Sequence, residues 1–174
     1  MKKIIVTGGT GFFGLNWFNF TKKKYLNILL KNKKNLKLKN LVKIDLTNPI
    51  LLKKKILKIN PNIIIHAAAQ TNLDIPNYLK IKETKDQIKI IKNLKRICNQ
   101  YKILLIFISS DQLYNGKKSI YNERDKYSPI NWYSKSKVLC ENEVKKIKKF
   151  VIIRTNFFGW APKNRKSFSD FILF

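Results

Sequence analysis

The stretch Lys3-Ile4-Ile5-Val6-Thr7-Gly8-Gly9-Thr10-Gly11-Phe12-Phe13-Gly14 opens the chain and decides its fold. Residues 3–6 are a short apolar run that predicts a buried strand, and residues 15–24 predict a helix. Between them, a glycine at the tight turn has no Cβ to clash, and a second lets backbone N–H groups approach a pyrophosphate. A third glycine allows close packing of the helix. The unit therefore predicts a dinucleotide-binding loop, with the amino end of the helix facing the phosphates.

Apolar runs and helical stretches continue to alternate along the rest of the chain. Because the apolar runs are continuous, they are typical of a parallel sheet that is covered on both faces. The sequence thus predicts an α/β fold, a doubly wound parallel sheet of about six strands with helices on both faces. The further strands are expected at residues 26–30, 41–46, 62–66, 103–108 and 151–153, and the further helices at residues 49–59, 83–98 and 131–149.

The composition is strongly basic, with 37 Lys and Arg against 10 Asp and Glu and a net charge of +27. Such a charge first suggests a nucleic acid or an anionic membrane as partner. Only four of the cations are arginines, however, and the abundance of Lys, Asn and Ile is typical of an AT-rich genome. No recognition helix or RNA-binding motif appears. The sequence therefore does not favour a nucleic-acid partner.

Cysteine and histidine are too scarce to build a metal centre. Cys98 and Cys140 form no CxxC pair, and His66 is the single histidine, so neither a metal site nor a disulfide framework is predicted. The longest apolar runs, such as residues 103–108, are too short to span a bilayer, and the first residues do not form a signal peptide. We expect a reduced, cytoplasmic protein without a membrane span.

Tyr133 and Lys137 form a YxxxK pair on one face of a predicted helix. The same stripe continues through Cys140 and Val144, so the pair should face the sheet. A lysine ammonium favours the phenolate and lowers the pKa of a nearby phenol, which allows a tyrosine to donate a proton to a carbonyl oxygen. The alternative is an ordinary amphipathic helix in a lysine-rich chain.

Polar residues Ser109-Ser110-Asp111 follow the strand predicted at residues 103–108. Ligands of open parallel sheets bind beyond the carboxyl ends of the strands. A serine hydroxyl there could hold a substrate carbonyl group while Tyr133 protonates it. The alternative is a polar strand end that caps the next segment.

The segment Leu30-Lys31-Asn32-Lys33-Lys34, at the end of the second predicted strand, contains no acidic residue. An Asp or Glu at this place accepts a hydrogen bond from the adenosine 2′-hydroxyl group and selects NAD. Lysines suit a 2′-phosphate instead. The sequence therefore favours NADP(H), with NAD(H) as the alternative because lysines are abundant throughout.

These blocks follow one another in the order of the extended short-chain dehydrogenase/reductase superfamily, which the chain resembles over essentially its whole length. The finer resemblance is to the sugar-nucleotide reductases of the dTDP-4-dehydrorhamnose reductase family. Besides the glycine loop and the Tyr133–Lys137 pair, the matching blocks are Asp45-Leu46, residues 66–74 (HAAAQTNLD), residues 109–116 (SSDQLYNG), Pro129-Ile130-Asn131-Trp132 and residues 154–159 (RTNFFG).

The resemblance implies a Rossmann-type oxidoreductase that reduces a 4-keto nucleotide sugar with NADPH, in deoxysugar or surface-polysaccharide synthesis. Its catalytic residues would be Ser110, Tyr133 and Lys137, and Ser110 and Asp111 would lie next to the substrate. The residues that the resemblance places at the cofactor are Gly8, Gly11, Phe12, Phe13, Gly14, Asp45, Leu46, Ala69, Gln70, Thr71, Tyr133 and Lys137.

The chain departs from the family at His66 and in length. His66 replaces the usual Asn, and we interpret it as a structural histidine. Residues 1–160 correspond to the NAD(P)-binding domain, whereas residues 161–174 resemble only the start of the C-terminal substrate-binding part, which is otherwise missing. A homodimer partner or a separate chain could supply that part. The alternatives are a non-catalytic NADP-binding or regulatory subunit, such as that of methionine adenosyltransferase, or an inactive truncated remnant.

Overall fold

The computed structural model describes residues 1–31 and 40–159, in which six strands form one sheet. The strand order is β3-β2-β1-β4-β5-β6, and every neighbouring pair is parallel. The strands are β1 (Lys3–Thr7), β2 (Leu26–Lys31), β3 (Leu41–Lys43), β4 (Ile63–His66), β5 (Leu104–Ile108) and β6 (Phe150–Ile153). The helices are α1 (Phe12–Thr21), α2 (Pro49–Ile59), α3 (Asn77–Tyr101) and α4 (Trp132–Val144), with a short 3-10 helix η1 (Asp111–Leu113).

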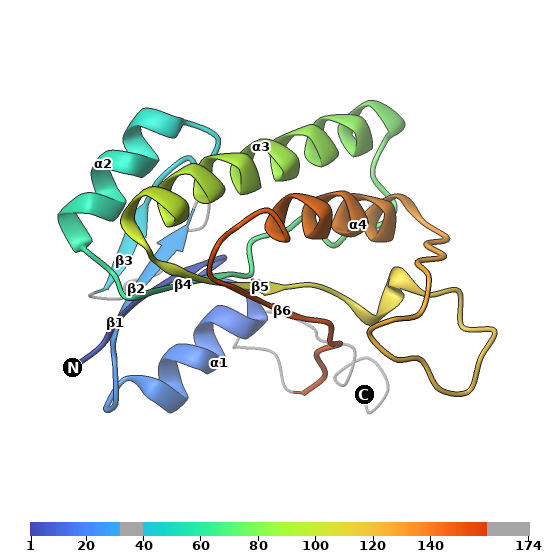
Figure 1. The fold of residues 1–174 in the computed structure, drawn as a ribbon, viewed down its shortest axis with the longest axis horizontal. Helices are drawn as coiled ribbons and strands as arrows, with labels where there is room; N and C mark the ends of the chain where they lie inside the picture. Colours follow the sequence, from blue (N-terminus) through green and yellow to red (C-terminus); the bar gives the residue numbers. More distant parts are fainter. Residues whose placement is uncertain (32–39, 160–174) are drawn as a thin grey trace.

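Helices cover both faces of the sheet (Figure 1). On one face, α2, α3 and α4 enclose a large core that includes Leu52, Ile91 and Val144. On the other face, α1 packs its aromatic side chains against a smaller core around Val6 and Leu29. The doubly wound α/β fold that the alternation predicts is confirmed.

Local signals explain where several helices begin and end. The Asn48 side chain accepts hydrogen bonds from the backbone N–H groups of Ile50 and Leu51, and Pro49 occupies the first turn, as the sequence predicts for this helix start. α4 begins with a capping box between Asn131 and Ser134. These caps fix the entry of each helix without help from the core.

Several element boundaries differ from the prediction, among them the end of α4, which lies at Val144 and not at residue 149. α1 begins directly after Gly11, because Gly14 inside its first turn is required by packing rather than by helix propensity. α3 begins six residues earlier than expected, at Asn77, since its first turns are largely exposed and carry no apolar periodicity. β3 ends at Lys43, so the Asp45-Leu46 pair lies beyond the strand and not within it.

Two parts of the prediction fall outside the described residues. These are the lysine tract at residues 32–39 and the C-terminal part at residues 161–174. Within the described ranges, no helix is long and apolar enough to cross a membrane.

Candidate functional site

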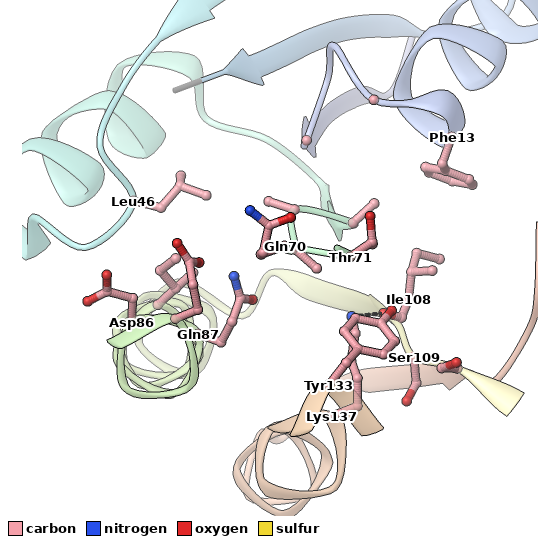
Figure 2. A pocket seen from close by; sticks show the side chains of 18 of the residues that line it. Phe13, Leu46, Gln70, Thr71, Asp86, Gln87, Ile108, Ser109, Tyr133 and Lys137 are labelled. Atoms are coloured by element: carbon pink, nitrogen blue, oxygen red, sulfur yellow. Dashed lines mark hydrogen bonds between the residues drawn. The ribbon is translucent and has the colours of Figure 1, made fainter. Parts of the chain in front are cut away.

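A cleft of about 1080 Å³ lies beyond the carboxyl ends of the strands. In the sheet, β2 and β3 lie on one side of β1, whereas β4, β5 and β6 lie on the other, so the strand order reverses beside β1. Open α/β sheets bind their ligands beyond the carboxyl ends of the strands at such a reversal, and the cleft lies there. The loops after β1, β3, β4 and β5 line it together with residues of α3 and α4. Figure 2 shows side chains from these segments converging from opposite sides.

The glycine loop forms one wall of the cleft. Gly8 has a φ of 69°, and a Cβ on it would lie 2.9 Å from the backbone nitrogen of Ala68. A Cβ on Gly14 would come within 2.6 Å of both the Gly8 carbonyl oxygen and the Gly9 Cα. Gly11 differs, because within 4 Å its Cβ would meet only the Gly8 carbonyl oxygen, at 3.0 Å. Space beside Gly11 is therefore open to a ligand.

The amino end of α1 points its first-turn N–H groups toward this open space. Gly11 precedes the helix, and no side chain caps it. Uncapped N–H groups at a helix start, with the helix dipole behind them, suit an anionic group such as a pyrophosphate. The loop and helix thus have the geometry that the sequence predicts for a dinucleotide site.

Thr7 and His66 hold the segment after β4 in place. The Thr7 hydroxyl oxygen accepts hydrogen bonds from the N–H groups of Ala67 and Ala68, both at 3.2 Å, and lies 2.7 Å from His66 Nδ1. With both acceptor positions used, the hydroxyl proton points to Nδ1. Burial, followed by the charge of Lys137, lowers the His66 pKa to about 3, so the ring is neutral.

His66 therefore has a structural contact, as expected, through Nδ1. Its Nε2 atom is buried and has no hydrogen-bond partner among the described residues. The segment that His66 and Thr7 anchor continues into Ala69, Gln70 and Thr71, and all three line the cleft.

The end of the cleft near β2 and β3 contains Asp45 and Leu46, as the resemblance implies. Hydrogen bonds from the Thr47 hydroxyl and backbone N–H to Asp45 Oδ1, at 2.8 and 2.9 Å, lower the pKa of that carboxyl group. Lys31 also lines this end.

Two residues that the sequence analysis missed, Asp86 and Gln87 of α3, point into the same end of the cleft (Figure 2). They lie within a lysine-rich helix whose pattern gives no sign of a site. The packing of α3 against the sheet decides which of its residues face the cleft, and the sequence pattern does not specify this.

Tyr133 and Lys137 lie together at the opposite end (Figure 2), which Ser110 also lines. Lys137 is buried, and its Nζ donates a 2.8 Å hydrogen bond to the carbonyl oxygen of Ile108, the last residue of β5. The same Nζ lies 5.6 Å from the centre of the Tyr133 ring. The Ser110 hydroxyl accepts from the N–H of Gln112 and donates to Asp111 Oδ1, at 3.1 Å each. A phenol, an ammonium and a hydroxyl thus share one corner of the cleft.

The acid–base properties of this corner follow from its burial. Burial lowers the Lys137 pKa to about 8, against the favourable charge of Glu141. For Tyr133 the expectation of a lowered pKa is wrong in this structure. Burial and the charge of Asp111 raise it, and the Ser110 hydroxyl only partly opposes them. The Lys137 ammonium, which the sequence analysis expects to lower this pKa, donates instead to the Ile108 carbonyl group.

Not every expected site residue lines the cleft. Asp111 lies instead at an adjoining pocket of about 500 Å³, next to Tyr114 and Arg154. Gly14 is buried against the glycine loop. The expected residues that do line the cleft are Gly8, Gly11, Phe12, Phe13, Asp45, Leu46, Ala69, Gln70, Thr71, Ser110, Tyr133 and Lys137. Within the described ranges, no three His, Cys, Asp or Glu side chains are grouped to hold a metal ion.

Comparisons with known proteins agree with this geometry. A family model described as the RmlD substrate binding domain matches residues 1–172. The crystal structure of a hypothetical dTDP-4-dehydrorhamnose reductase from Sulfolobus tokodaii is 30% identical, with a TM-score of 0.81 over 91% of this chain and 57% of that chain. The dTDP-4-dehydrorhamnose reductase from Bacillus anthracis, solved in complex with NADP, is 27% identical, with a TM-score of 0.79 over 94% and 57%.

A curated relative extends the similarity to another sugar-nucleotide enzyme. The dTDP-D-glucose 4,6-dehydratase of Dictyostelium discoideum is 29% identical over 177 residues, which cover 83% of this chain and 40% of that protein. The chain thus spans about half the length of these relatives.

Proposed function

The chain belongs to the RmlD substrate-binding-domain family, among sugar-nucleotide-modifying short-chain dehydrogenases/reductases, and on that premise we propose that it reduces a 4-keto nucleotide sugar with NADPH. One observation carries the proposal. The Tyr133 phenol, the Ser110 hydroxyl and the Lys137 ammonium line one end of a cleft whose wall is the glycine loop. We assign the reaction to the dTDP-4-dehydrorhamnose reductase type and to deoxysugar or polysaccharide synthesis.

The residues of the cleft fit a nicotinamide dinucleotide. The open space beside Gly11 and the uncapped start of α1 would accept the pyrophosphate, with Phe12 and Phe13 beside it. Asp45 and Leu46 would contact the adenosine half, and Ala69, Gln70 and Thr71 the nicotinamide half. When bound, the reduced nicotinamide supplies the hydride that the reaction needs.

We propose NADPH rather than NADH. Lys31 lines the β2 end of the cleft, where a cation would meet a 2′-phosphate. The Bacillus anthracis relative, which was solved with NADP, supports the same choice. NADH stays the alternative.

In this mechanism, the chain's own groups hold the substrate carbonyl and deliver a proton. Ser110 donates a hydrogen bond to the carbonyl oxygen, and Asp111 lies next to the sugar. Tyr133 gives its phenol proton to that oxygen as the carbonyl carbon is reduced. Lys137 stays protonated and stabilises the developing phenolate, and with a cofactor bound it would also donate to the nicotinamide ribose. Its present hydrogen bond to Ile108 leaves two further N–H donors for these contacts.

We further propose that residues 1–160 form the dinucleotide-binding domain. The support is that all the described residues lining the cleft lie between Gly8 and Phe157. A second candidate function is a non-catalytic NADP-binding or regulatory subunit, which is supported by 31% identity over 84 residues, 48% of this chain and 25% of that protein, to the methionine adenosyltransferase 2 subunit beta of Rattus norvegicus.

One assay separates the two functions. NADPH oxidation is followed spectroscopically with a dTDP-4-keto sugar, in parallel with an equilibrium titration of NADPH. A reductase oxidises NADPH only when the keto sugar is present. Binding without any turnover, at substrate and enzyme concentrations that detect a single turnover, would reject the reductase and support the regulatory subunit.

A further inference from the structure

Arg154 connects several segments around the proposed catalytic corner. It follows β6 directly and directs its guanidinium group into the protein, where the side chain is 13% exposed. Its Nε and Nη2 donate to the two carboxylate oxygens of Glu141, at 3.1 and 2.8 Å. Nη2 also donates to the Tyr127 hydroxyl, and Nη1 donates to the Tyr114 hydroxyl and the Glu123 carbonyl oxygen. The five contacts match the five N–H donors of an arginine.

Glu141 is the counterpart of Arg154 on α4. It is fully buried and lies four residues after Lys137, which in turn lies four residues after Tyr133, so the three side chains share one helix face. Burial disfavours the charged carboxylate, but the hydrogen bonds led by Arg154 outweigh it and lower the Glu141 pKa. The pair is therefore ionised and bidentate, the geometry that fixes both partners in direction as well as distance.

The two tyrosines link this pair to the segments that carry the proposed catalytic groups. Tyr114 lies on the segment that leaves Ser110, and Tyr127 lies on the segment that enters α4 ahead of Tyr133. Tyr127 also donates a 2.6 Å hydrogen bond to Glu141 Oε2. A single guanidinium group thus contacts the segment after β5, the segment before α4, and α4 itself.

A second contact fixes the same helix one turn away. Lys137 donates to the Ile108 carbonyl oxygen, and Ile108 pairs with Ile153, the residue before Arg154. Helix α4 is consequently attached to the ends of two strands that are themselves in register. Movement of either attachment would change the separation between Ser110 and the Tyr133–Lys137 pair.

We propose that Arg154 and Glu141 are positioning residues, whose buried ion pair sets the placement of Tyr133 and Lys137 relative to Ser110. The kinetic part of this inference rests on the proposed function, whereas the structural part does not. Neither Arg154 nor Glu141 lines the main cleft, so any effect on the corner is transmitted through α4 and the two tyrosine-bearing segments.

The charge of Glu141 also affects the protonation of Lys137. The groups that face Lys137 are His66 of β4, Phe107 of β5, and Tyr133, Cys140 and Glu141 of its own helix. Glu141 is the carboxylate that supports the charged form of Lys137. Its removal should therefore let Lys137 lose its proton at a lower pH.

Fluorine NMR of the full chain with 3-fluorotyrosine in place of tyrosine tests the positioning without cofactor or turnover. The seven resonances are assigned by single Tyr→Phe changes. We expect Arg154→Lys and Glu141→Gln to shift the Tyr114 and Tyr127 resonances and also the resonance and titration midpoint of Tyr133, which neither residue touches. Glu143→Gln is the matched control on the same helix, because Glu143 pairs outward with Lys95 and Lys146.

The result that overturns the proposal is a Tyr133 resonance and midpoint that stay at the wild-type values while those of Tyr114 and Tyr127 move. If Arg154→Lys and Glu141→Gln both fail to fold, Tyr127→Phe removes a single hydroxyl of the same network, and the Tyr114 and Tyr133 resonances are then compared.

Kinetic measurements give a second, independent test of the positioning role. Misplacement of a catalytic group by about 1 Å costs on the order of 10²-fold in rate. We expect Arg154→Lys to lower kcat by up to that factor with KM nearly unchanged, and Glu141→Gln to lower the pH above which NADPH binding weakens. An inactive wild type would reject the proposed function, whereas the fluorine NMR result would still decide the positioning. Equal kcat values in wild type and Arg154→Lys would reject the positioning alone.

Discussion

Removal of the phenol oxygen of Tyr133 tests its role in catalysis separately from any role in cofactor binding. The phenol gives up its proton only in the transition state, so its loss should appear in the rate and not in cofactor affinity. We expect Tyr133→Phe to lower kcat by roughly 10²–10⁴-fold and to leave NADPH affinity within a small factor of wild type. NADPH oxidation with a dTDP-4-keto sugar measures the first quantity, and calorimetric titration the second.

Tyr101→Phe, the same change at the far end of α3, is the control and should alter neither quantity. Lys137→Ala should weaken both, since that ammonium is assigned to the phenolate and to the ribose. Unchanged turnover in Tyr133→Phe would remove Tyr133 as the proton donor.

Lys137 makes the site sensitive to alkaline pH. Its pKa is lowered to about 8 by burial, so the side chain is charged below pH 8 and becomes neutral as the pH rises through that value. Turnover and NADPH affinity should therefore both fall as the pH rises past about 8. Lys137→Arg keeps a positive charge at alkaline pH and should remove this inflection, even where its activity is lower. An inflection at the same pH in both proteins would assign it to another group.

At the scale of the elements, the glycine loop offers two substitutions whose costs in stability should differ. Gly14→Ala places a Cβ about 2.6 Å from the backbone of Gly8 and Gly9, and neither can retreat without distorting the loop. We expect this change to reduce the free energy of unfolding by about 1–3 kcal/mol. Gly11→Ala meets a single atom at 3.0 Å and should cost much less. Urea denaturation of the two variants compares them, and equal losses would contradict the packing assigned to Gly14.

The elements also show which features a sequence can predict. Strand identity, the Asn48–Pro49 helix start and the glycine loop follow from local chemistry, and the structure has them where they are expected. The starts of α1 and α3 could not be predicted, because one depends on a close backbone approach and the other on exposed turns that no core pattern marks.

The candidate site, too, could be predicted only where its residues belong to local sequence motifs. Residues in recognisable blocks, such as Ser110 and Tyr133, line the cleft together. Asp86 and Gln87 reach it through the way α3 packs against the sheet, and the direction of the Lys137 ammonium depends on a backbone carbonyl group of β5. Neither fact is a property of a motif, so no sequence pattern could reveal it.

Across the whole molecule, large apolar side chains are exposed along one margin. The edge strand β6 exposes Val151 and Ile153, and the segment after it exposes Phe157 and, at 81%, Phe158. Contiguous exposed apolar surface promotes association. Trp160, Phe168 and Phe171, which follow in the sequence, lie outside the described residues.

We expect the isolated chain to self-associate at working concentrations, as measured by light scattering. Phe158→Ser should reduce the apparent mass, whereas Phe20→Ser, an equally exposed change at the end of α1, should have little effect. A sharply monomeric wild type would contradict this prediction.

The central claim is that the cleft beside the glycine loop binds a nicotinamide dinucleotide, and an equilibrium titration of NADPH into the full chain tests it most directly. We predict binding to one site with a dissociation constant in the micromolar to millimolar range, and its loss in Gly11→Leu, whose side chain would occupy the space of the pyrophosphate. Thermal denaturation of the variant, run alongside, shows that the fold is kept. Absence of binding to the folded wild type at millimolar NADPH and NADH, or equal binding by wild type and Gly11→Leu, would contradict the account.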